Sequence, residues 1–448
     1  MSFLNDYFHL AENGTNVRRE CIAGLTTFLS MAYILAINPN ILGNVMDASG
    51  VFVATAIASA FATFVMGLLA NYPIVLSAGM GLNAYFAFSV CLGDLAGDPN
   101  AFRIGLTAVF LEGVVFIVLS LFSFRERIVN GIPIALKLGI SGGIGLFIAL
   151  IGLKGAGIVV PNQATLISLG DLSAAPVVLC LAGLLLIFIL TSYRVTGAVL
   201  IGILLTWAFG MIAQVTGWYQ GPNIFPDFSR GLQLDGITKT AFQFDFAWAA
   251  THITEFIAIT LSFLYVDLFD TVGTVVGVAD KAGLLDKHGY LPRVGRVFMS
   301  DALGTVAGAC LGTSTVTSFV ESSAGVAAGG RTGLTAMVAG VLFLCSLVLS
   351  PIFLAIPAFA TAPALIFVGM LMVQSTTRID FSGDYADVAG AFMAILLTPL
   401  TYSIANGIMF AIITWVILKV ACGKSREVSP IMWTVFVLFG FRIISLVS

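Results

Sequence analysis

Charged residues are scarce in this chain. Only 10% of its 448 residues are Asp, Glu, Lys or Arg, whereas soluble domains carry about 25%. Hydrophobic residues make up 59%, the mean hydropathy is +1.04, and apolar stretches near the ~20 residues needed to cross a bilayer recur along the whole length. These properties exclude a soluble globular protein and indicate an all-α polytopic membrane protein. The apolar runs are continuous rather than alternating, which excludes an outer-membrane barrel.

Signals of several other protein classes are also missing. The formal net charge of −3 gives no basic excess that would attract nucleic acid. The six cysteines lie mostly in apolar runs without metal-type spacing, so neither a disulfide framework nor a metal centre is expected. The polar N-terminus has no cleavable signal pattern. No P-loop and no nucleophile–base or metal-ligand arrangement is present, which argues against an enzyme and against a bound cofactor.

Apolar segments divide the chain into two sets of seven. A polar N-terminal stretch, 1–20, precedes a first repeat, 21–216, and an external loop, 217–248, separates it from a second repeat, 249–421. The C-terminal stretch 422–448 follows, in which the apolar residues 430–446 suit an interfacial helix. We expect about fourteen transmembrane segments at 21–37, 51–70, 74–90, 104–123, 138–153, 176–192, 197–215, 249–277, 297–312, 316–328, 332–350, 359–374, 385–401 and 404–421.

The distribution of cations predicts the orientation of these segments. Lys and Arg residues gather in loops that all fall on one side when the segments are counted, and that side is the cytoplasmic one. With an even number of crossings, both termini are expected in the cytoplasm. The cations concerned are Arg18 and Arg19, those of the stretch 124–137, and Lys281, Lys287, Arg293, Arg296, Lys424 and Arg426.

Seven segments per repeat is an odd number, so the two repeats are expected to have opposite topologies. In the first repeat, a span leads into a glycine-interrupted segment around Gly79, Gly81 and Asn83. In the second repeat, a span leads into a similarly broken segment around Glu321 and Gly325. Paired broken helices at corresponding positions in inverted repeats point to a transporter binding site, because an interrupted helix exposes backbone N–H groups and a positive dipole end at mid-membrane.

Two carboxylates lie near the middle of the eighth expected segment. Asp267 and Asp270 are three residues apart, so they share a helix face, on which Thr271 and Thr274 add hydroxyl groups. An acid at membrane depth costs roughly 2.5–3.5 kcal/mol on insertion scales and normally faces a cavity or a partner. The pattern therefore favours a functional site that can carry a proton; the alternative is a polar contact between neighbouring helices.

Glu321 stands between Ser318 and Ser322 in an otherwise uncharged, glycine-rich segment. We interpret Glu321 as a ligand-binding acid and the glycines as places of close backbone approach. The alternatives are a cap or interface role for the acid and tight helix packing for the glycines. Asn83 offers both a donor and an acceptor, and an interhelical hydrogen bond explains it equally well.

Two further acids near spans lack such a context. No glycine break accompanies Glu112 or Glu255, which favours structural or interfacial roles for both.

The motifs GMGLNAYFAF, VDLFDTVGT and TSTVTSFVESSAGVAAGGRTGLTA together resemble the AzgA-like purine permease branch of the nucleobase–cation symporter family, also called nucleobase–ascorbate transporters. The resemblance extends over essentially the full chain, including GTNVRRECIAGLTTFLSMAYILAINPNIL and ATAPALIFVGMLM. A glutamate-containing motif of the uracil and xanthine branches is absent from the eighth segment, which favours the purine branch.

The resemblance implies a fourteen-span homodimer with a core domain and a gate domain, in which the broken third and tenth segments contribute short strands. It implies import of adenine, guanine or hypoxanthine across the bacterial inner membrane by proton symport. The proton is then the coupling ion, Asp270, Asp267 and Glu321 are the proton-coupling acids, and the lipid bilayer is the surrounding partner. The expected substrate-binding residues are Glu321, Asp270, Asp267, Asn83, Gly81, Thr271, Ser318 and Ser322.

Two alternatives remain open at this point. One is a transporter of the same architecture for another substrate, such as xanthine, uracil or an anion. An anion would require cations in the core, whereas the spans contain acids. The other is a channel without coupled transport.

Overall fold

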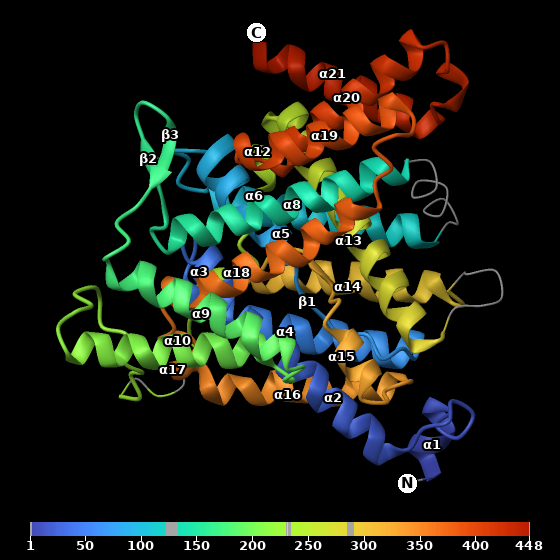
Figure 1. Ribbon diagram of the computed structural model, residues 1–448. Coiled ribbons are helices and arrows are strands. Elements are labelled where there is room, and N and C mark those ends of the chain that lie inside the picture. Colours follow the sequence, from blue (N-terminus) through green and yellow to red (C-terminus); the bar gives the residue numbers. More distant parts are fainter. Residues whose placement is uncertain (1, 122–132, 230, 232–233, 285–290, 448) are drawn as a thin grey trace.

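The computed structural model describes residues 2–121, 133–229, 231, 234–284 and 291–447. Most of these residues form helices that lie roughly side by side (Figure 1). Ten helices of the described part are long and apolar enough to cross a membrane, which confirms the polytopic α-helical class. The count of fourteen segments stays a prediction.

The elements of the first repeat follow the expected order, with a break in the first segment and a strand in the third. A long helix, a short strand and a short helix succeed one another between residues 48 and 84. The elements are α1 (Ser2–Phe8), α2 (Val17–Met31), α3 (Ile34–Leu42), α4 (Ala48–Val65), η1 (Met66–Ala70), β1 (Leu76–Ala78), α5 (Met80–Ala84), η2 (Tyr85–Asp94), α6 (Ala101–Leu121), α8 (Ile134–Gly155), β2 (Val159–Asn162), β3 (Leu166–Leu169), α9 (Ala175–Ser192) and α10 (Ala198–Val215).

The second repeat has the same succession of a long helix, a strand and a short helix. The elements are α11 (Ile237–Thr240), α12 (Phe246–Thr251), α13 (Ile253–Ala282), α14 (Val294–Leu311), β4 (Val316–Ser318), α15 (Ser322–Ala327), α16 (Gly333–Cys345), η3 (Ser346–Leu349), α17 (Ser350–Phe353), α18 (Ala358–Val373), η4 (Gln374–Arg378), α19 (Tyr385–Leu400), α20 (Ile404–Ala421), η5 (Ser425–Glu427) and α21 (Pro430–Val447). Helices α4 and α14, which precede the two broken segments, pack against each other.

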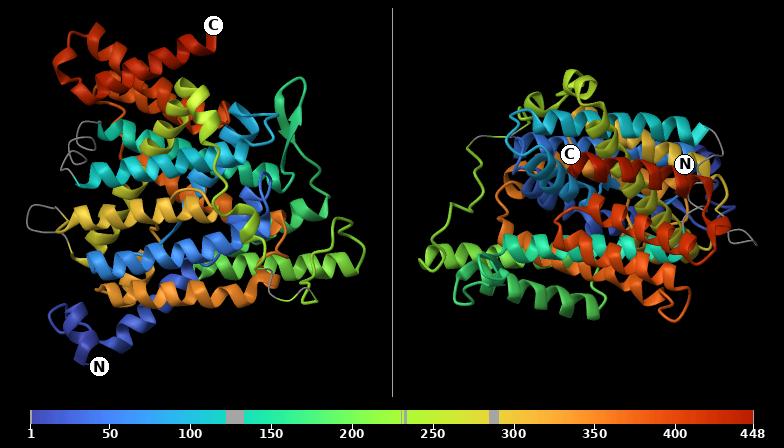
Figure 2. Two further views of the ribbon diagram at one scale, coloured as in Figure 1. Left: turned by 180° about the vertical axis from the view of Figure 1, so that it is seen from behind. Right: turned by 90° about the horizontal axis from the view of Figure 1, so that it is seen from above.

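The helices pack as two bodies, which the view from above separates (Figure 2). The core body consists of α2–α6 and α13–α16, whose most extensive contacts are with one another. The gate body consists of α8–α10 and α18–α20, which likewise pack mainly among themselves. This division agrees with the core and gate domains that the family resemblance implies. Helix α21 contacts α20 of the gate body and α13 of the core body.

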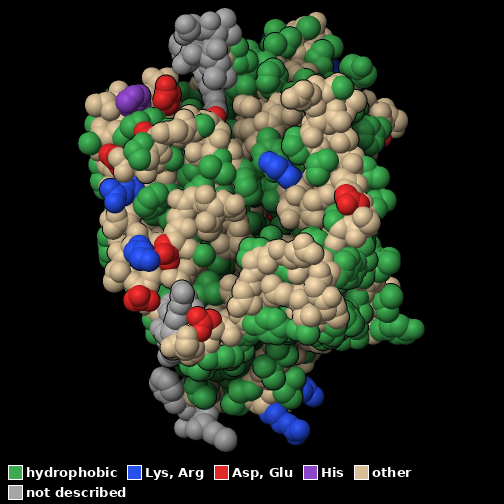
Figure 3. Space-filling view, turned by 90° about the vertical axis from the view of Figure 1, so that its left-hand side faces the viewer, with side chains coloured by type: hydrophobic (Ala, Val, Ile, Leu, Met, Phe, Trp, Pro, Cys, Tyr) green, Lys and Arg blue, Asp and Glu red, His purple; other side chains and the backbone are tan. Residues whose placement is uncertain are grey.

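The N-terminal segment and one of the cations used to predict orientation lie at the same end of the molecule. Tyr7 Oη donates to the carbonyl of Leu68 (3.0 Å), and Arg296 Nη1 donates to the carbonyl of Leu69 (3.5 Å). An unexpected hairpin, β2–β3, lies toward the opposite end, at the left of Figure 1. That face carries scattered charges of both signs rather than a continuous basic surface (Figure 3). Residues 124–132 and Lys287 lie outside the described residues.

Glu20 joins the start of the first segment to the loop between α15 and α16. Its buried carboxylate accepts hydrogen bonds from the backbone N–H groups of Arg331 (2.9 Å), Thr332 (3.3 Å) and Thr335 (3.1 Å). The Thr335 hydroxyl donates a further bond of 2.6 Å. A carboxylate near a helix N-terminus is stabilised by the helix dipole as well as by these donors. The glycine-rich end of the tenth segment is therefore fixed to α2.

Gly312 ends α14 just before β4, and the structure predicts that it tolerates no side chain. Its φ of +96° favours glycine, and an added Cβ would lie 2.3 Å from Thr240 Cβ. We expect Gly312→Ala to lower the thermal midpoint of the purified protein by several degrees. Gly423→Ala is the matched control, because Gly423 has a φ of +73° with nothing within 4 Å of the added Cβ. Both variants carry the left-handed backbone cost of about 1–2 kcal/mol, so equal losses of midpoint would contradict the predicted clash.

Candidate binding site at the strand crossing

The two broken segments meet at the centre of the core body, where strands β1 and β4 pair; this strand pair and the residues next to it are called the crossing. Strand β1 pairs antiparallel with β4, in a register that places Ser77 opposite Thr317. Two further backbone bonds extend the pairing, from Gly79 N to the carbonyl of Thr315 (3.0 Å) and from Phe319 N to the carbonyl of Val75 (3.0 Å). No water is available inside a bilayer for exposed backbone groups, so extended segments must satisfy each other. The expected short strands are thus present.

A run of three hydroxyl residues leads into β4, and each binds a different element. The strand is therefore attached through side chains as well as through its backbone. The three bonds run from Asn38 Nδ2 of α3 to Thr313 Oγ1 (2.9 Å), from Ser314 Oγ to Asn83 Oδ1 of α5, and from Thr315 Oγ1 to Glu112 Oε2 of α6 (2.9 Å).

Two carboxylates and three hydroxyls form a buried network around the residues of β4 itself. Thr271 Oγ1 of α13 donates to Asp301 Oδ2 of α14 (2.6 Å) and lies 3.2 Å from Asp267 Oδ1. Thr271 Oγ1 also lies 2.9 Å from Thr317 Oγ1, and Ser318 Oγ donates to Asp301 Oδ1 (3.3 Å). All five residues are buried. Hydroxyl groups therefore hold both acids through hydrogen bonds.

Glu321 follows the strand and immediately precedes α15. Its side chain makes no capping bond to that helix; instead, its Oε1 accepts a hydrogen bond from the Tyr33 hydroxyl, at the break between α2 and α3. Glu321 and Asp270 are both partly exposed and close enough to interact electrostatically. The two acids that were expected to share a site thus lie within range of electrostatic interaction, whereas Asp267 is buried in the network around Thr271.

The remaining expected site residues have distinct surroundings. Ser322 Oγ accepts from Val75 N (3.0 Å), so it serves the backbone next to β1. Asn83 is buried, and its Nδ2 has no hydrogen-bond partner among the described residues. An added Cβ on Gly81 would lie 2.8 Å from Ile144 Cγ2 of α8, which places Gly81 at the contact between the two bodies. The roles of these residues in binding stay predictions.

Gly325 fits the packing alternative. A Cβ at this position would lie 2.0 Å from Thr27 Oγ1 of α2. The small residue therefore lets α15 approach α2 closely, which is the usual use of glycine between membrane helices.

Sequence reasoning missed three residues around the crossing. Asp301 carried a usable signal, because it is an acid inside the expected segment 297–312. The structural role expected for Glu112 agrees with its buried hydrogen bond to Thr315 beside β4. Tyr33 and Asn38 had no distinguishing pattern. Glu255, in contrast, lies exposed in the first turn of α13.

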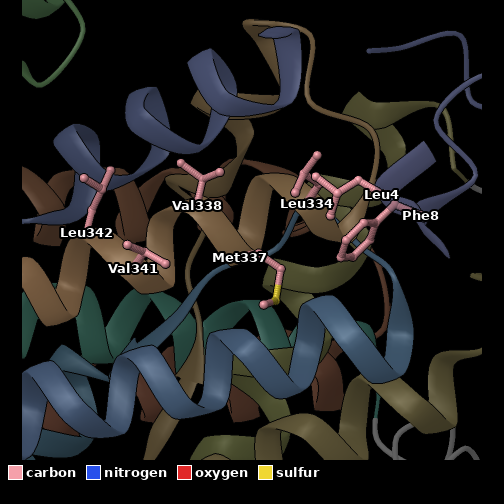
Figure 4. Close-up of a pocket in the computed structure, with 7 residues that line it drawn as sticks. All are labelled: Leu4, Phe8, Leu334, Met337, Val338, Val341 and Leu342. Atoms are coloured by element: carbon pink, nitrogen blue, oxygen red, sulfur yellow. The ribbon is translucent and has the colours of Figure 1, made fainter. Parts of the chain in front are cut away.

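One hollow on the described part of the chain lies away from the crossing. It has a volume of about 340 Å³ and is formed between α1 and α16 (Figure 4). Its lining is entirely apolar and consists of Leu4, Phe8, Leu334, Met337, Val338, Val341 and Leu342. A second hollow of about 160 Å³ includes Asn44, Cys91 and Asp98 in its lining. Neither hollow contains an acid of the crossing.

The arrangement of two helical bodies around crossed strands is the fold of membrane transporters. The transmembrane domain of the cyanobacterial bicarbonate transporter BicA superposes with a TM-score of 0.67 at 15% identity, covering 87% of this chain and 97% of that one. SLC26A9 gives a TM-score of 0.67 at 12% identity, covering 91% of this chain and 66% of that one. Identities this low show a shared fold alone.

The sequence comparison is more specific, and it shows that the chain belongs to the Permease family, whose profile matches residues 18–410. The guanine/hypoxanthine permease PbuG of Bacillus subtilis is 44% identical, covering 97% of this chain and 98% of its own. The adenine permease AdeQ of Escherichia coli is 41% identical, and the match covers 98% of this chain and 96% of AdeQ. A Methanocaldococcus jannaschii protein is 47% identical, and the match covers 100% of this chain and 99% of that protein.

Thr271 is predicted to hold the network around Asp267 and Asp301 together. We expect Thr271→Val to lower solute uptake per folded molecule and to cost about 1–3 kcal/mol of stability, because the buried acids lose a hydrogen-bond partner. The measurements are uptake normalised to membrane abundance and the thermal midpoint.

Thr260→Val is the matched control on the same helix. The Thr260 hydroxyl is buried and has no hydrogen-bond partner among the described residues, so this variant should behave like the parent. Equal uptake and equal thermal midpoints of the two variants would show that the network contributes neither to transport nor to stability.

Proposed function

We propose that this protein is a secondary active transporter that imports purine nucleobases by proton symport. The observation that carries the proposal is the pair of neighbouring, partly exposed acids, Asp270 and Glu321, beside the strand crossing. Acids held inside a membrane mark substrate and ion pathways. The substrate class is supported by relatives over 40% identical that are named as adenine and guanine/hypoxanthine permeases.

Recognition of a purine is assigned to Glu321 and Asn83. A purine edge presents N–H donors, and a carboxylate accepts such donors in strong, charge-assisted hydrogen bonds. Tyr33 donates to Oε1 of Glu321, while the Glu321 residue as a whole is partly exposed. Nδ2 of Asn83, which has no hydrogen-bond partner in the described part of the chain, supplies a donor for a ring nitrogen or an exocyclic oxygen of the base. A base lacking the complementary groups leaves these side chains unpaired, which costs about 1–3 kcal/mol per lost contact.

Proton coupling is assigned to the same region. Asp270 interacts with Glu321, so the charge on one acid affects the energy of charging the other. Asp267 lies deeper and is connected to Asp301 through Thr271. We assign contact with the substrate to Asp270 rather than to Asp267, because Asp270 is partly exposed and Asp267 is buried.

An anion carrier is the competing function on this fold, and BicA is a bicarbonate transporter by its title. An anion buried near the crossing would require a compensating positive charge. Asp270 and Glu321 lie beside the crossing instead, and negative charge on either acid would repel an anion. This chemistry favours a neutral substrate that bears hydrogen-bond donors.

The same proposal includes a bacterial inner (plasma) membrane location with both termini in the cytoplasm. The location of Tyr7 and Arg296 at one end of the molecule supports a common side for the N-terminus and the cationic loops. Fourteen segments and a homodimer complete the proposed assembly.

Glu321→Gln tests the assignment of the base-binding acid. The amide keeps the size of the side chain but removes its charge, and hydrogen bonds to charged groups contribute about 1.5–3 kcal/mol. We expect the affinity for the transported purine to fall by about tenfold or more. Glu255→Gln, at an exposed position of α13, is the control. Near-normal purine uptake by a correctly inserted Glu321→Gln protein would remove the central assignment.

Coupled transport predicts uphill accumulation of the substrate. Cells or proteoliposomes containing the wild-type protein should concentrate labelled adenine, guanine or hypoxanthine, and a protonophore should abolish the gradient. A competition series that includes xanthine and uracil then defines the preferred base. Equilibration without accumulation would indicate a channel, and uptake unaffected by every purine would indicate another substrate.

A further inference from the structure

We propose that Tyr33 is a positioning residue for substrate binding, which fixes the Glu321 carboxylate through its phenol hydroxyl and does not itself touch the substrate. The inference rests on the proposed function for the meaning of the site. The contact between the two side chains does not depend on that function. The Tyr33 hydroxyl donates to Glu321 Oε1, and the two residues are 288 positions apart in the sequence.

The surroundings of Tyr33 are consistent with an indirect role. The side chain is completely buried, whereas Glu321 is partly exposed. In this structure Tyr33 therefore has no surface that a ligand could contact, whereas Glu321 has some. Its ring occupies the place where the first segment is interrupted, between α2 and α3, so it is held by the backbone of both helices.

Close packing of two helices brings the pair together. Gly325 of α15 approaches Thr27 of α2 so closely that no side chain fits between them. Tyr33 lies six residues after Thr27, and Glu321 lies four residues before Gly325. The glycine therefore has an indirect function, because it sets the distance at which the phenol reaches the acid.

The chemistry of the pair explains why a tyrosine serves here. Glu321 precedes a short helix without capping it, so no cap hydrogen bond to α15 orients its side chain. A phenol donates one hydrogen bond and carries no charge, so it can orient the carboxylate without neutralising it as Lys or Arg would. The acid is thereby held in one orientation before the substrate arrives, which lowers the ordering cost of binding.

Tyr33→Phe removes only the hydroxyl group. We expect the KM for the transported purine to rise on the order of tenfold, because a hydrogen bond to a charged group is lost. The maximal rate per folded molecule should stay within about twofold of the wild type. Tyr72→Phe is the matched control, because Tyr72 is also buried and its hydroxyl donates to the carbonyl of Pro292 (2.6 Å) rather than to Glu321. A KM that does not change, or that changes equally in both variants, would overturn the inference.

A second measurement needs no substrate. Tyr33→Phe should lower the thermal midpoint of the purified wild-type protein but have little effect in a Glu321→Ala background, where the hydroxyl has already lost its partner. Equal losses of midpoint in both backgrounds would contradict the pairing. If the wild-type protein transports no purine, the proposed function fails while this thermal comparison still decides whether Tyr33 and Glu321 interact.

Discussion

The constraint on which the structure depends is that backbone polar groups inside a bilayer must find partners within the protein. A continuous helix satisfies that requirement internally, but the third and tenth segments are interrupted, which exposes N–H and C=O groups at mid-membrane. Pairing β1 with β4 satisfies both interruptions at once. Each broken segment thus needs the other, and the crossing brings residues about 240 positions apart in sequence into one place.

Hydroxyl groups extend this arrangement to the side chains. Thr313, Ser314 and Thr315 are bonded to α3, α5 and α6, and the residues of β4 itself contact α13 and α14. A hydroxyl can donate to a carboxylate and still accept from another group, so a few Ser and Thr residues satisfy several buried acids. Hydrogen bonds from hydroxyl groups therefore help to accommodate Asp267, Asp301 and Glu112 at the crossing.

Composition and apolar length predicted the membrane class, and the glycine, serine and threonine content identified both broken segments. The two bodies and the strands were expected only through the family resemblance, because a three-residue strand has no periodicity of its own. The acids of α13 were recognised by charge within an apolar run, and Asp301 could have been found in the same way. Tyr33 could not, since a buried tyrosine in an aromatic-rich chain becomes informative only when its partner is known. The β2–β3 hairpin was missed because the sequence between α8 and α9 has no strong alternation.

The contact at Gly81 bears on which interactions would change if the core body moved relative to the gate body. Gly81 faces the aliphatic side chains of Ile144 and Ile148, so the contact between the two bodies is apolar at this point. The hydrogen bonds described at the crossing, including that between Tyr33 and Glu321, all lie within the core body. A movement of the core body relative to the gate body would therefore carry the polar residues of the crossing together, and it would break none of those hydrogen bonds.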